Sequence, residues 1–134
     1  MYPLLKLFAL ANDRRGPKTI EFQQHLFAYA TRSDADIHIA RNIEYLLTSS
    51  NLHNVKQMYL SAPCGVWGGP AGRLLNTTWR YLFNDMKPRV LKVVPIEADE
   101  YEAIKEEVLA EMEQFYTYIN WYVTCGQKPW TKSH

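Results

Sequence analysis

Residues 98–124 read ADEYEAIKEEVLAEMEQFYTYINWYVT and lie between Pro95 and Gly126. An apolar residue recurs every three or four positions, which places these side chains on one face of a helix. The members of this stripe are Tyr101, Ile104, Val108, Met112, Phe115, Ile119 and Tyr122. Carboxylates near residue 98 suit the positive end of a helix dipole, and Gly126 suits the position after the last turn. The stretch therefore predicts one helix of about 25 residues.

Shorter segments upstream show the same spacing. They cover about 19–31, 34–47, 52–60 and 70–87, and a short one follows Pro3 as far as Asn12-Asp13. Pro88 is expected to end the 70–87 helix, because the residue before a proline disfavours helical backbone. The β-branched residues of 89–94 then predict an extended connector or one short strand.

These segments together predict an all-α protein: a compact, single-domain bundle of five to six helices with a long C-terminal helix. At 134 residues and 47 % hydrophobic content the chain can bury a core as one domain over residues 1–134. Residues 127–134 are expected to fray as a polar tail.

The sequence excludes several classes of protein. Cys64 and Cys125 form no CxxC pair, and the four histidines show no ligand spacing, so no metal and no cofactor is expected. Free thiols suit a reducing cytoplasm, which is the predicted location. No apolar run has the length of a membrane span, so no membrane partner is expected.

Charge is distributed unevenly along the chain. Residues 1–95 hold 12 Lys/Arg against 6 Asp/Glu, whereas residues 96–134 hold 3 against 8. One interpretation is that the acidic C-terminal helix lies across a basic body and neutralises it. The other is a basic face that stays open to an anionic partner.

Aromatic residues favour a binding role. Tyr118 and Trp121 lie off the apolar stripe of the C-terminal helix, and Trp67 lies in a loop, so all three are candidate partner-binding residues. We therefore favour a non-enzymatic protein-binding module, with self-association through the aromatic C-terminal helix as one form of it.

Nucleic-acid binding is the alternative. Helices over 34–47 and 52–60, joined by Thr48-Ser49-Ser50, have the outline of a helix-turn-helix, although no glycine occupies the turn. Basic and polar side chains in this pair and in an upstream turn could contact phosphates and base edges. They are Arg14, Arg15, Lys18, Asn51, His53, Asn54, Lys56 and Gln57.

A small enzyme or anion binder at the glycine-rich segment 62–73 is the third hypothesis. Gly68, Gly69 and Gly72 precede Arg73 at an expected helix start, where exposed amides attract anions. The segment lacks the Lys-Ser or Lys-Thr of a phosphate-binding loop. Cys64 could serve as a nucleophile, but no local motif supplies its base, so no catalytic residue is assigned.

Overall fold

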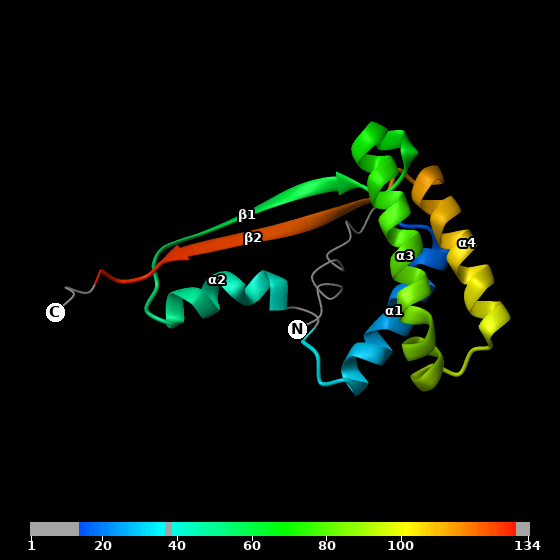
Figure 1. Cartoon of the computed structure of the whole chain (residues 1–134), viewed down its shortest axis with the longest axis horizontal. Coiled ribbons are helices and arrows are strands. Elements are labelled where there is room, and N and C mark those ends of the chain that lie inside the picture. Colours follow the sequence, from blue (N-terminus) through cyan, green and yellow to red (C-terminus); the bar gives the residue numbers. More distant parts are fainter. Residues whose placement is uncertain (1–13, 37–38, 131–134) are drawn as a thin grey trace.

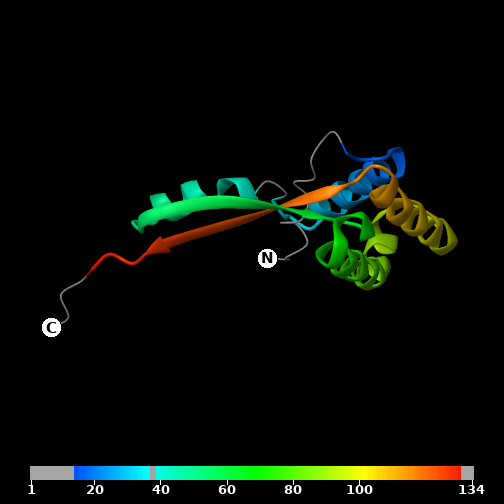
Figure 2. The ribbon, with the colours of Figure 1, turned by 90° about the horizontal axis from the view of Figure 1, so that it is seen from above.

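The computed structural model describes residues 14–36 and 39–130, which form a helical head and a projecting arm (Figure 1). The head contains α1 (Pro17–Arg32), the 3-10 turn η2 (Val66–Gly68), α3 (Gly69–Val93) and α4 (Ala98–Gln114). The arm contains α2 (Ile39–Ser49), β1 (His53–Pro63) and β2 (Tyr118–Gln127). The two strands pair antiparallel in a two-stranded ribbon, and α2 lies along one side of it (Figures 1 and 2).

The prediction of an all-α bundle of five to six helices is wrong, because the ribbon replaces helix in two places. Residues 52–60, expected as a helix, belong mostly to β1, and the expected C-terminal helix stops at Gln114. The segment beyond it is rich in aromatic and β-branched residues, which favour strand backbone. Helical spacing and strand alternation both fit such a segment, since aromatic and aliphatic residues occupy seven of the ten positions 115–124.

The backbone at the end of α4 explains why the single helix predicted for residues 98–124 is observed as a helix followed by a strand. Tyr116 takes a left-handed backbone conformation with φ 51°. The Thr117 amide then donates to the Met112 carbonyl at 3.1 Å, and the Tyr116 amide donates to the Glu113 carbonyl at 3.4 Å. This is a Schellman motif, a helix end in which glycine usually holds the left-handed position. Tyrosine in that position gives no sequence signal for a helix stop.

The helices α1 and α2 end in the same way. Asp34 and Asn51 hold the left-handed positions with φ 53° and 60°. The Ala35 amide donates to the Ala30 carbonyl at 3.0 Å, and the Leu52 amide donates to the Leu47 carbonyl at 3.4 Å. The bend at Asn51 lets the chain leave α2 and return along it as β1.

Pro88 does not end α3, which was also predicted wrongly. The helix continues to Val93, so residues 89–94 contain no strand. Pro88 is exposed, whereas Met86 and Val90 on either side of it are buried. Packing of these neighbours holds the helix together across the missing amide hydrogen bond. The short helix predicted after Pro3 lies outside the described residues.

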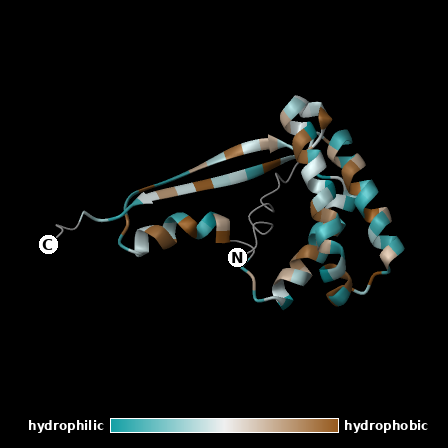
Figure 3. Cartoon of the chain, in the orientation of Figure 1, coloured by the Kyte–Doolittle hydropathy of each residue, from teal (hydrophilic) through white to brown (hydrophobic). Residues whose placement is uncertain are grey.

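The core lies between the three helices of the head. Phe83 is fully buried and its ring centroid lies 4.4 Å from that of Phe22, 6.1 Å from that of Trp79 and 6.2 Å from that of Tyr101. The Tyr101 hydroxyl donates a 2.6 Å hydrogen bond to the Phe83 carbonyl and so joins α4 to α3. Figure 3 shows hydrophobic residues along the helices of the head and also along both strands of the arm.

No helix within residues 14–36 and 39–130 is long and apolar enough to cross a membrane.

Candidate interaction surface

The ribbon has two faces of different character. Between Lys56 and Pro63 its register is regular, so residues opposite one another share a face. The first face, which we call the covered face, consists of Gln57, Tyr59, Ser61 and Pro63 from β1 with Tyr118, Asn120, Tyr122 and Thr124 from β2. The second, which we call the open face, consists of Lys56, Met58, Leu60 and Ala62 from β1 with Ile119, Trp121, Val123 and Cys125 from β2.

The helix α2 packs on the covered face. The Gln57 side chain donates to the Ala40 carbonyl at 3.4 Å, and Ala40 itself is 4 % exposed. Further along the same face, the Ser61 hydroxyl donates to the Asn120 side chain at 2.7 Å. Tyr59 lies against Tyr122 with ring centroids 5.9 Å apart. This face is therefore polar and aromatic, and its distal half lies under α2.

The open face is apolar and nothing in the described part of the chain covers its middle. Met58 is 62 % exposed, Leu60 61 %, Val123 49 % and Trp121 36 %. They form two adjacent rows, because Met58 pairs with Val123 and Leu60 with Trp121. Figures 1 and 2 show α2 on one side of the ribbon only. A contiguous exposed apolar patch of this kind is typical of an interaction site.

The three predicted partner-binding residues lie on different surfaces. Trp121 is central to the open face, whereas Tyr118 lies at the base of the covered face, where the Arg14 guanidinium is 5.5 Å from its ring centre. Trp67 lies in η2 on the head, with its ring edge-on to Tyr116 at 5.6 Å. Met58 and Leu60 are not among the predicted residues, because the spacing of 52–60 predicts a helix there.

The predicted nucleic-acid residues are divided between the two parts of the molecule. Arg14 and Arg15 directly precede α1 in the head, and Lys18 lies in its first turn. The Lys18 ammonium forms ion pairs with Glu21 at 2.9 Å and Glu107 at 3.7 Å, and Glu21 raises the pKa of Lys18. The remaining members belong to the distal half of the arm, at and after the turn between α2 and β1. They are Asn51, His53, Asn54, Lys56 and Gln57.

The glycine-rich segment packs closely against the base of the ribbon. A Cβ on Gly72 would overlap the Gly65 carbonyl oxygen, and one on Gly68 would overlap the Pro63 ring. Gly69 has φ 73°, a conformation that glycine adopts readily, and Arg73 is exposed. These glycines therefore have a structural reason to be present, namely the tight turn from β1 into α3.

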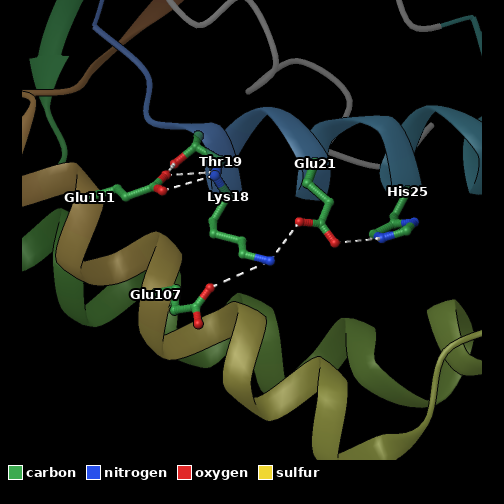
Figure 4. A network of polar contacts seen from close by, with 6 residues as sticks. All are labelled: Lys18, Thr19, Glu21, His25, Glu107 and Glu111. Carbon is green, nitrogen blue, oxygen red and sulfur yellow. Dashed lines mark hydrogen bonds and ion pairs between the residues drawn. The ribbon is translucent and has the colours of Figure 1, made fainter.

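Two carboxylates of the protein itself accept hydrogen bonds from backbone amides at the starts of helices in the head. The Glu113 carboxylate accepts from the Val66 amide at 2.6 Å and from the Trp67 amide at 3.3 Å, beside the proposed anion site. Glu111 does the same at the start of α1, where it accepts from the Lys18 and Thr19 amides at 2.8 Å and from the Thr19 hydroxyl at 2.9 Å (Figure 4). Both carboxylates come from α4.

Other carboxylates of α4 pair with the basic side chains of the head. Glu102 lies 2.7 Å from Lys87 and 2.6 Å from Lys105, and hydrogen bonds from both lysines lower the pKa of Glu102. Glu106 lies 3.4 Å from Arg80. The acidic helix thus lies against the basic residues of α1 and α3.

Cys64 is poorly placed for catalysis. Its side chain is fully buried, and desolvation raises the pKa of the thiol to about 12. The thiol therefore stays protonated at neutral pH, whereas the nucleophilic form of cysteine is the thiolate. Cys125 is exposed at the distal end of the open face, and the two cysteines are not bonded to each other. Within residues 14–36 and 39–130, no three His, Cys, Asp or Glu side chains are grouped to hold a metal ion.

Comparisons with known proteins give no match to this chain, whether with family models, with curated proteins or with solved structures.

Proposed function

We propose that this protein is a non-enzymatic protein-binding module that contacts its partner through the open face of the arm. The observation that carries the proposal is the pair of adjacent rows Met58–Val123 and Leu60–Trp121, which project from the head and remain exposed. Trp and Met are enriched in protein interfaces and act as anchors when buried there.

The limited stability of a two-stranded ribbon supports the same proposal. A two-stranded ribbon is marginally stable in water unless a further layer covers it. The helix α2 supplies that layer for the covered face, whereas the rows Met58–Val123 and Leu60–Trp121 of the open face lack one within the described residues. A partner that covers it would stabilise the arm and remove apolar surface from water.

The other hypotheses remain untested predictions. Nucleic-acid binding would have to use residues divided between the head and the arm tip, with Lys18 already paired to carboxylates. An anion at Gly68, Gly69, Gly72 and Arg73 would approach the Glu113 carboxylate, which repels it. The cytoplasmic location also remains a prediction.

A capture experiment with matched variants tests the proposal. Leu60 and Tyr59 are neighbours on β1 with 61 % and 62 % exposure, but they lie on opposite faces. We expect the wild-type chain and Tyr59→Thr to retain the same partner from native lysate, while Leu60→Thr retains about tenfold less. The measurement is quantitative mass spectrometry of the bound fraction, with and without nuclease.

Equal retention by all three proteins would show that the open face is not the contact surface. Loss of retention on nuclease treatment would favour the nucleic-acid alternative instead.

A further inference from the structure

We infer that the open face binds the open face of a second copy of this chain, so that two ribbons stack between two α2 helices. This inference rests on the proposed function and names the partner. Stacked sheets lie about 10 Å apart with their side chains interdigitated, which is the arrangement of an ordinary sheet core.

The chemistry of the open face suits a copy of itself. Of its eight residues only Lys56 carries a charge, and none is acidic. Such a face offers no array of charges for a complementary partner to recognise. In a two-fold contact the same surface serves both copies, so an apolar face with uncharged central rows is self-complementary.

The area of the open face fits a weak, reversible dimer. The row Ala62–Ile119 packs into the head, where Ile119 is fully buried, so three exposed rows remain, from Lys56–Cys125 to Leu60–Trp121. These rows span about 13 Å, and with their side chains they offer on the order of 500 Å² per copy. Two copies would bury on the order of 1,000 Å², the lower limit for a specific interface, which suggests a dissociation constant on the order of 1–100 μM.

The two heads lie at opposite ends of this dimer. Figure 2 shows that the head extends to both sides of the ribbon, so two heads at the same end would collide. Opposite ends also separate the two Lys56 ammonium groups, because each lies at the distal end of its own ribbon. When the three exposed rows of the two copies overlap, four residues, or about 13 Å, separate the two Cys125 along the strands, and the sheets lie about 10 Å apart. The two Cys125 Cα atoms are then about 16 Å apart.

Sedimentation equilibrium of the purified full chain tests the inference. We expect concentration-dependent dimerisation between about 1 μM and 1 mM for the wild-type chain and Tyr59→Thr. Leu60→Thr is expected to weaken the dimer by about ten- to hundredfold, because each copy loses a buried leucine. Met58→Lys is a second variant at a 62 % exposed position, where substitution leaves the folded monomer intact. It should abolish dimerisation.

A chain that stays monomeric at the highest concentration would overturn the inference, as would a dimer that Leu60→Thr and Met58→Lys leave unchanged. A monomer that still loses capture of another protein through Leu60→Thr would overturn the second copy as partner but not the proposed function. If Leu60→Thr left both dimerisation and capture unchanged, the inference and the proposed function would both be overturned.

The orientation has its own readout. A spin label attaches to Cys125 alone in the native protein, since Cys64 is fully buried. We expect a distance between labels of about 16 Å or more in the dimer. A distance near the sheet spacing of about 10 Å would overturn the arrangement with heads at opposite ends, because it places the distal rows together.

Discussion

Phe83→Ala is expected to lower the free energy of unfolding by about 3–5 kcal/mol, which is the usual range for truncating a buried phenylalanine. Phe83 is fully buried at the centre of the head, where its ring contacts Phe22, Trp79 and Tyr101 from all three helices. The cavity left by the substitution has neighbours on every side, so it cannot collapse easily. Chemical denaturation followed by circular dichroism measures the loss.

Tyr81 provides the matched control. It lies on the same helix two residues earlier and is 71 % exposed. We expect Tyr81→Ala to change the free energy of unfolding by less than about 0.5 kcal/mol, since exposed positions contribute little. Similar losses for the two variants would contradict the arrangement of the head core.

Glu111→Ala is expected to lower the free energy of unfolding by about 2–4 kcal/mol, because it removes the cap of a neighbouring helix. The N-cap residue of α1 is Gly16, which has no side chain to cap the helix. Glu111, only 8 % exposed, accepts three hydrogen bonds there from Lys18 and Thr19 (Figure 4). Its negative charge also lies at the positive end of the α1 dipole, which stabilises the helix. Gly16 permits this close approach, since a Cβ would overlap the Glu111 side chain.

Glu107 is the control for that substitution. It lies one turn earlier on α4, its side chain is 52 % exposed, and it pairs with Lys18 at 3.7 Å. Exposed ion pairs contribute little, so Glu107→Ala should cost less than about 0.5 kcal/mol in the same denaturation experiment. If Glu111→Ala were as mild as Glu107→Ala, solvent would have to cap α1 equally well.

The helix in the first half of residues 98–124 could be predicted from the sequence. Tyr101, Ile104, Val108 and Met112 are all buried on α4, as their helical spacing predicts. The stripe fails at Phe115, which is 36 % exposed at the end of the helix. Spacing is informative while one face of a helix is buried and the others are acidic, as in this half.

The second half could not be predicted because its helix stop has no sequence signal. Tyr116 adopts the left-handed conformation without being glycine or asparagine, and the chain behind it then pairs with β1. The energy that selects the strand comes from pairing with residues 53–63, some 60 positions away in the sequence. Local patterns do not contain that information.

Part of the interaction surface could be predicted from the sequence. Its position off the predicted helical stripe makes Trp121 a candidate from the sequence, and Trp121 is central to the open face. Met58 and Leu60 were missed, yet both follow strand alternation, as do Trp121 and Val123 two residues apart. What the sequence lacks is the position of α2, which decides that one face of the ribbon is covered and the other open.

The central claim is that the open face contacts another protein chain. Hydroxyl-radical oxidation of Met58, Trp121 and Tyr59, read by mass spectrometry, tests it directly in cells that produce the protein and in purified protein diluted to about 1 μM. We predict that Met58 and Trp121 react more slowly in cells than after dilution, while Tyr59 reacts equally in both. Equal reactivity of Met58 and Trp121 in the two samples would show that nothing covers the open face and would contradict the claim.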